Sequence, residues 1–171
     1  MWIRSSEQPF ELRFVLDGML GGLARWLRML GYEAEYDPQM SDDMLLQMSL
    51  SKGVILLTGD QELHERAEKR SVDSILVQGQ TESERLAQLA KDAGISLAID
   101  MATTRCPVCG SQLKQIERSE ASRTVPAASL KLYDMFWKCT GSECGKTYWI
   151  GSHWKKIRET LDEAQKIARG G

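Results

Sequence analysis

Residues 12–31, LRFVLDGMLGGLARWLRMLG, decide the fold of this chain. The apolar run Leu12–Leu16 predicts a short strand, and the acidic residue Asp17 follows it directly. Across Leu20–Leu30 the apolar residues recur at the i, i+3, i+4, i+7 spacing of one helix face, and Gly31 predicts the end of that helix. A strand, an acid and an amphipathic helix in direct succession are typical of the first unit of an α/β sheet.

The same alternation continues to about residue 99. Further strands are expected at Tyr32–Tyr36, Val54–Leu57 and Ser74–Val77. Helices are expected at Ser41–Lys52, at Gln61–Arg70, and from the capping-box residue Thr81 to just before Gly94. Strands that alternate with helices pair in parallel through right-handed crossovers. The sequence therefore predicts an α/β domain of three layers with a mainly parallel sheet.

Carboxylates gather at one predicted edge of this sheet. Asp17 follows the first strand and Asp60 follows the third, with Glu62 two residues further on. Asp42 and Asp43 open the helix after the second strand. Sites in open α/β sheets form outside the carboxyl ends of the strands, so we expect these acids to lie close together. Crowded carboxylates repel one another unless a cation lies among them.

Magnesium or manganese suits such a cluster, because both prefer carboxylate oxygen and keep waters that leave room for a substrate phosphate. A metal held in this way activates water and neutralises charge at phosphorus, which favours phosphodiester hydrolysis. Three of these acids also have a local explanation. Asp42 and Asp43 complement a helix dipole, and Asp60 is a helix N-cap. The prediction therefore depends on the acids occurring together.

Composition and charge divide the chain. The 171 residues hold 22 basic and 24 acidic side chains and 42% hydrophobic residues, which excludes a disordered or collagen-like protein. Residues 1–103 carry 10 basic and 17 acidic side chains, whereas residues 104–158 carry 10 and 4. We expect an N-terminal extension (1–11), an α/β domain (12–103), a cysteine-containing module (104–152) and a C-terminal helix and tail (153–171).

The predicted cellular location of the protein rests on two features that the sequence lacks. No stretch reaches the roughly 18–20 uncharged residues of a membrane span, and the first residues do not follow the pattern of a signal peptide. The prediction is a cytoplasmic protein with no membrane partner.

Four cysteines form two pairs, Cys106-Pro-Val-Cys109 and Cys139-Thr-Gly-Ser-Glu-Cys144. Each pair can present two thiolates from a tight turn, and four thiolates complete a tetrahedral structural zinc site. Disulfides are the alternative, which a reducing cytosol disfavours. The second pair is irregular, because four residues separate its cysteines where two are commoner.

The cysteine-containing module is basic and aromatic. Its lysines and arginines alternate with six aromatic residues: Tyr133, Phe136, Trp137, Tyr148, Trp149 and Trp154. This composition suits a surface that holds RNA phosphates and stacks unpaired bases. The alternative is that the aromatic rings form a small core and the cations a solvated rim, and we expect some of each.

The chain resembles a known family over about residues 12–156. This is the PIN-like RNase domain with a C-terminal zinc ribbon, which occurs as a stand-alone prokaryotic protein and at the C-terminus of mutator-type exoribonucleases. The matching segments are Phe14–Tyr32, Ser41–Leu46, Ile55–Asp60, the two cysteine pairs and Tyr148–Trp154.

The resemblance implies a PIN-like fold whose acids bind magnesium or manganese and hydrolyse RNA. By motif, Asp17 is the acid of the first strand and Asp60 the acid of the Thr-x-Asp motif. Asp42 or Asp43 is the helix acid, and Glu62 takes a weaker fourth place. All five are candidate catalytic residues, and Asp17, Asp43 and Asp60 are the expected metal ligands.

The resemblance also suggests substrate contacts at Arg25, Arg28 and Thr58. The chain departs from the family pattern at two positions. It has Gly22 where the family usually has lysine, and Gly59 where the family often has arginine. Both changes remove a cation beside the proposed metal site.

Alternative functions remain open at this stage. The missing cations favour a non-catalytic RNA- or protein-binding module built on a PIN-like scaffold. An α/β phosphatase with Asp17 as nucleophile is a third interpretation, although Met19 stands where such enzymes commonly have a second acid. The RNA target, the choice between endo- and exonuclease, the number of metals and the oligomeric state are not specified. Helical spacing of Ile157, Leu161 and Ala164 predicts a helix that packs on this domain or on another copy.

Overall fold

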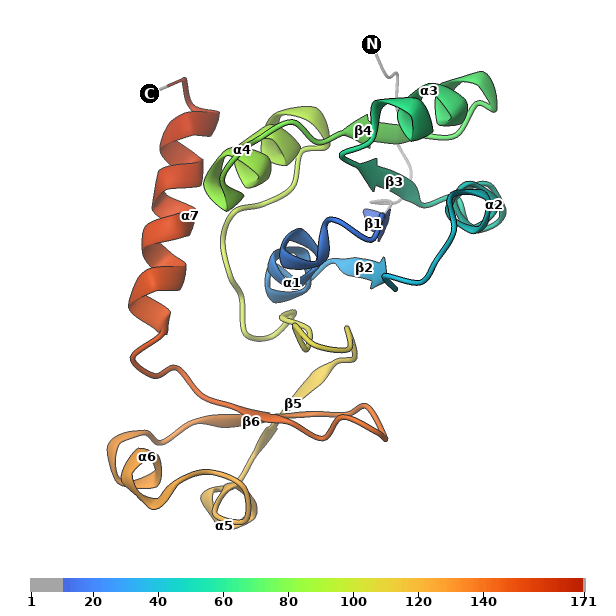
Figure 1. Cartoon of the computed structure of the whole chain (residues 1–171). Coiled ribbons are helices and arrows are strands. Elements are labelled where there is room, and N and C mark those ends of the chain that lie inside the picture. Colours follow the sequence, from blue (N-terminus) through green and yellow to red (C-terminus); the bar gives the residue numbers. More distant parts are fainter. Residues whose placement is uncertain (1–10, 171) are drawn as a thin grey trace.

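The computed structural model describes residues 11–170, and residues 1–10 of the predicted N-terminal extension lie outside this range (Figure 1). Four strands form the first sheet: β1 (Arg13–Leu16), β2 (Glu33–Tyr36), β3 (Ile55–Thr58) and β4 (Ser74–Leu76). Their order is β2-β1-β3-β4, and every neighbouring pair is parallel. The predicted α/β class with a parallel sheet is confirmed.

Helices cover both faces of this sheet. The four helices are α1 (Gly21–Met29), α2 (Asp42–Lys52), α3 (Gln61–Lys69) and α4 (Glu82–Asp92). Phe14 and Leu16 of β1 pack into the core with α1 and α4, whereas Val15 packs with α2 and α3. Successive side chains of a strand point to opposite faces, so one short strand contributes to both cores.

Local sequence signals fix where these helices begin and end. The Ser41 hydroxyl accepts a hydrogen bond from the Met44 amide at the start of α2, and Thr81 with Glu84 forms the expected capping box of α4. Gly53 ends α2 in the left-handed conformation at φ 61°, which glycine adopts without steric cost.

The cysteine-containing module is a second, antiparallel sheet. Its strands are β5 (Leu113–Ile116), β6 (Phe136–Cys139) and β7 (Thr147–Tyr148), in that order. The short helices α5 (Arg118–Ala121) and α6 (Ala127–Leu132) lie between β5 and β6 in the chain. Its small core consists of Ile116, Ala121, Val125 and Phe136, with Trp149 packed against them. The prediction that the aromatic residues supply part of a core is correct.

The last helix, α7 (Trp154–Ala168), returns to the α/β domain and lies beside α4 (Figure 1). Leu161 and Ala164 are buried in the same core as Leu86 of α4. The Ser83 hydroxyl, which has one proton to donate, lies 3.2 Å from the Thr160 carbonyl and 2.9 Å from Glu163 Oε2. Helix α7 therefore packs on the α/β domain, and the antiparallel sheet lies between α4 and α7 in the chain.

Substitution of Leu161 tests this arrangement. Leu161 is 5% exposed, so Leu161→Ala leaves a cavity and is expected to lower the free energy of unfolding by about 2–5 kcal/mol. Leu50→Ala on α2, where the side chain is 55% exposed, is the control and is expected to change it by less than about 0.5 kcal/mol. Urea unfolding followed by circular dichroism measures both. Equal stability of the two variants would contradict the packing of α7 on α4.

Candidate functional site

Asp17 lies where β1 ends, with its side chain only 7% exposed. Its amide donates to the Leu57 carbonyl at 3.1 Å, which continues the β1–β3 pairing by one residue. One carboxylate oxygen accepts from the Met19 amide at 2.9 Å, and the other accepts from the Gly59 amide at 3.0 Å and from the Thr58 hydroxyl. Three donors therefore hold a buried carboxylate in one orientation.

The Thr58 hydroxyl links Asp17 to the second acid. While its proton goes to Asp17, its oxygen accepts from the Asp60 amide at 2.9 Å. Asp60 is the N-cap of α3, because one of its carboxylate oxygens accepts from the amides of Glu62 and Leu63. Thr58 is fully buried and its hydroxyl joins Asp17 to the Asp60 backbone, while its predicted contact with substrate stays a prediction.

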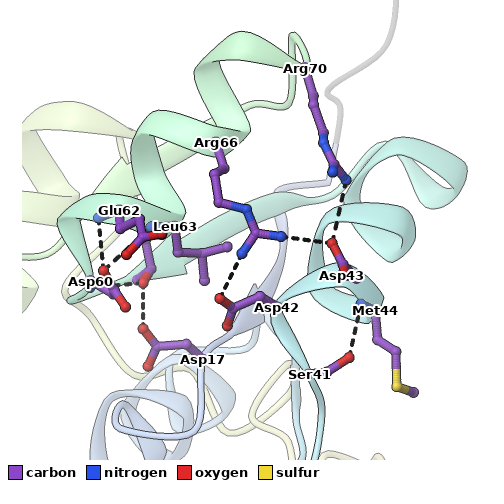
Figure 2. Close-up of polar contacts among 11 residues, drawn as sticks. Asp17, Ser41, Asp42, Asp43, Met44, Asp60, Glu62, Leu63, Arg66 and Arg70 are labelled. Carbon is purple, nitrogen blue, oxygen red and sulfur yellow. Dashed lines mark hydrogen bonds and ion pairs between the residues drawn. The ribbon is translucent and has the colours of Figure 1, made fainter.

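Asp42 and Asp43 open α2 and reach toward α3 (Figure 2). The Arg66 guanidinium lies 2.9 Å from Asp42 Oδ2 and 2.7 Å from Asp43 Oδ1. Arg70, one helical turn further along α3, lies 3.7 Å from Asp43. The sequence analysis missed both arginines, although their i, i+4 spacing on the helix that follows Asp60 is a usable signal.

Figure 2 shows that these acids come from three elements: the end of β1, the start of α2 and the start of α3. Glu62 is exposed in the first turn of α3 and contacts Asp60 through its backbone. Arg25 is exposed on α1. Within residues 11–170, only the four cysteines form a group of three or more potential ligands that lie close enough together to share a metal ion. The acids are thus brought to one edge but do not form a closed ligand cage.

The four cysteines do form such a group. Their Sγ atoms all lie within 4.8 Å of one another, with Cys106 and Cys144 at 3.7 Å and Cys109 and Cys139 at 3.3 Å. Sulfurs that share a tetrahedral zinc ion at about 2.3 Å stand about 3.8 Å apart. The cysteines are unbridged, so their geometry fits zinc and not a pair of disulfides.

The irregular second pair has a local explanation. The amides of Cys144 and Gly145 both donate to the Gly141 carbonyl at 3.2 Å, which closes a turn over the two extra residues. A Cβ atom at Gly141 would lie 3.2 Å from the Cys109 sulfur and 3.3 Å from the Cys139 sulfur. Only glycine lets the turn pass this close to the thiols.

The thiols differ in their electrostatic environment. Burial opposes ionisation of Cys109, but hydrogen bonds with Ser111 outweigh it and lower the pKa of that thiol to about 6. Burial raises the pKa of the Cys139 thiol to about 12. The Tyr148 hydroxyl lies 3.1 Å from the Cys106 sulfur, and burial together with this contact raises the pKa of Tyr148. A tyrosine that stays protonated is a constant donor to the thiolate.

Arg28 connects this centre to the α/β domain. It is 6% exposed, and its guanidinium donates to the Ala34 carbonyl at 2.9 Å, to Pro107 at 3.2 Å and to Val108 at 3.0 Å. Burial lowers the pKa of Arg28, while the thiolates of the first pair act in the opposite direction. The Nε and Nη1 donors of Arg28 are thus used within the protein, and its predicted contact with RNA phosphate stays a prediction. Its position one turn after Ala24, at the edge of the apolar face of α1, is the signal that separates it from Arg25.

The model of the Mut7-C RNAse domain family matches residues 12–161. The chain therefore belongs to the Mut7-C RNAse domain family, in agreement with the resemblance found in the sequence. No curated protein and no solved structure matches the chain. None of the helices between residues 11 and 170 is long and apolar enough to cross a membrane.

Arg28→Met tests the role of this arginine. The variant leaves three carbonyl groups without their donor, and two of them belong to the turn that carries Cys106 and Cys109. We expect a loss of about 2 kcal/mol or more in the free energy of unfolding and faster release of zinc to a chromogenic chelator. Arg25→Met, an exposed arginine on the same helix, is the matched control. Identical zinc release from the two variants would show that Arg28 does not hold this turn.

Proposed function

We propose that this protein is a ribonuclease that hydrolyses RNA phosphodiester bonds with magnesium or manganese held by the acids at the carboxyl edge of the first sheet. The observation that carries the proposal is the Thr58 hydroxyl, which joins Asp17 and the backbone of Asp60 within hydrogen-bond distance. Membership of an RNase domain family supports the reaction class. The same proposal includes a PIN-like fold and a cytoplasmic location, where the thiols stay reduced.

Asp17 and Asp60 are the proposed primary ligands. One or two carboxylates suffice for magnesium, which completes its coordination with water and substrate phosphate. Such an ion would supply an activated water and neutralise charge that develops at phosphorus. Hydrogen bonds from Thr58 and Gly59 fix the orientation of the Asp17 carboxylate in advance, so little ordering remains when the ion binds.

Of the two helix acids, we favour Asp42 over the predicted ligand Asp43. The Asp42 side chain is 50% exposed and the Asp43 side chain 75%, and two arginines contact Asp43. Arg66 holds both carboxylates at the start of α2 and reduces their repulsion in the absence of metal. Glu62 is proposed as an outer acid, and the exposed Arg25 as a phosphate contact near the start of α1.

Asp17→Asn tests the metal site. The amide keeps the shape of the carboxylate but not its charge, so cleavage of a labelled single-stranded RNA in the presence of Mn²⁺ is expected to fall at least about 100-fold. Asp73→Asn, at an exposed position just before β4, is the control and is expected to retain wild-type cleavage. Both proteins should keep their zinc and their unfolding midpoint within a few degrees. Cleavage by folded Asp17→Asn at the wild-type rate would refute the site.

The competing function is a non-catalytic binding module, and the glycines at positions 22 and 59 favour it. The two positions differ in the space that they offer. A Cβ atom at Gly59 would meet only the Val77 carbonyl, at 4.0 Å, whereas one at Gly22 would lie 3.1 Å from Glu82 Oε1. The Cβ atom of a larger residue at position 59 therefore displaces none of its neighbours.

Gly59→Arg separates the two functions. In a ribonuclease, a guanidinium beside Asp17 is expected to lower the KM for RNA several-fold, because it adds a phosphate contact at the reacting edge. Steady-state cleavage measures the KM. Gly53→Arg is the control for added charge alone. Only the KM of this control is compared, because the left-handed backbone at position 53 strains any side chain. No cleavage by either the wild type or Gly59→Arg, with RNA binding intact, would favour the binding module.

A further inference from the structure

A groove of about 710 Å³ lies where the two parts of the chain meet. The α/β domain contributes Met29 at the end of α1, Ile99 and Met101, and the start of the cysteine-containing module contributes Thr104 and Pro107. The antiparallel sheet contributes α6 and the segment from Thr147 to Ser152, and α7 closes one side. A volume of this size falls within the range of ligand sites and exceeds what one nucleobase needs.

The walls of this groove combine aromatic rings with a few polar groups. The aromatic residues are Tyr133, Tyr148, Trp149, His153 and Trp154. Ser129, Thr147 and Ser152 add hydroxyl groups to the same surface. Aromatic faces stack on any base, while hydroxyl groups can both donate to and accept from base edges.

Two of the rings have fixed positions. Trp149 packs against Phe136 of the small core, with ring centroids 6.5 Å apart. The Tyr148 hydroxyl contacts the Cys106 sulfur, so the tyrosine ring that lines the groove is held by the thiol centre. Rigid aromatic surfaces lose little conformational entropy when a planar ligand stacks on them.

Three exposed lysines are sequence neighbours of residues that line the groove. Lys131 lies next to the lining residue Leu132, and Lys155 and Lys156 follow the lining residue Trp154; all three lysines are exposed. Residues 104–158 as a whole hold 10 basic and 4 acidic side chains. An apolar peptide would fill the groove but would gain nothing from the lysines, whereas a nucleic-acid strand uses both features.

We propose that this groove binds unpaired bases of a single-stranded RNA while these neighbouring lysines contact the adjoining phosphates. The inference rests on the proposed function and deepens it by naming the surface that holds the substrate outside the acidic edge. Met29, which lines the groove, is the last residue of α1. Asp17 lies four positions before Gly21, the first residue of that helix. Nine helical residues rise about 13 Å, so one strand that reaches both sites spans several nucleotides.

A pair of exposed residues provides the test. Leu132 lines the groove and is 74% exposed, whereas Met135 is 52% exposed, three residues further on, and lies outside the groove. Leu132→Glu and Met135→Glu add the same charge to the same module without emptying a core position. Both are made in full-length, zinc-loaded Asp17→Asn protein, so that cleavage does not consume the probe.

The measurement is fluorescence anisotropy of a labelled 12-nucleotide single-stranded RNA at fixed ionic strength. Leu132→Glu is expected to weaken RNA binding at least about 5-fold, because loss of one stacked base has an effect of this order or larger. Met135→Glu is expected to change the affinity less than 2-fold, roughly the effect of one remote charge. Trp154→Ala, checked for folding by circular dichroism, is expected to weaken binding similarly to Leu132→Glu.

Equal losses in the two glutamate variants would overturn the proposal, because RNA would then be held by net charge alone. Unchanged RNA affinity together with disruption of a wild-type dimer by Leu132→Glu would overturn it as well and would assign the groove to a second copy. Sedimentation of the same samples gives the oligomeric state. Groove-dependent binding without cleavage by the wild type would refute the ribonuclease but not the RNA groove.

Discussion

The parallel register between β1 and β3 is the constraint on which the rest of the site depends. Leu16 pairs with Leu57, so Asp17 emerges beside Thr58 and Gly59, whose hydroxyl and amide orient its carboxylate. A slip of one residue would exchange the two faces of the strand, placing Leu16 in the core with α2 and α3 and Val15 in the core with α1 and α4. The apolar residues that fill both cores therefore also determine where the acids stand.

The second constraint is the way the cysteine-containing module, called the ribbon below, is attached. Arg28 contacts the turn of the first cysteine pair, and the Thr104 hydroxyl lies 2.9 Å from the Met29 carbonyl. The segment that leaves the α/β domain is therefore held against the end of α1. Helix α7 brings it back onto α4. Two anchors fix the ribbon more firmly than one linker would, and the groove between them gains a defined shape. The groove and the acidic edge thus lie near opposite ends of α1.

The local elements were predictable because their signals are local. The helix face of residues 20–30, the cap at Ser41 and the capping box at Thr81 each depend on residues within one or two turns. The convergence of Asp17 and Asp60 followed from parallel topology alone. The pairing of Asp42 and Asp43 with Arg66, the burial of Arg28 and the docking of α7 depend on contacts between residues more than 20 positions apart. Spacing along the chain does not encode such contacts, so the partners of Arg28 and Arg66 could not be predicted from the sequence.

The most direct test of the metal site is the binding of Mn²⁺ to the full-length, zinc-loaded protein, followed through the paramagnetic resonance signal of free Mn²⁺. We expect the wild type to bind Mn²⁺, and Asp17→Asn and Asp60→Asn to bind it at least about 10-fold more weakly, with zinc content unchanged. Equal Mn²⁺ affinity in all three proteins would contradict the assignment of these two aspartates as ligands, and with it the proposed mechanism of RNA hydrolysis.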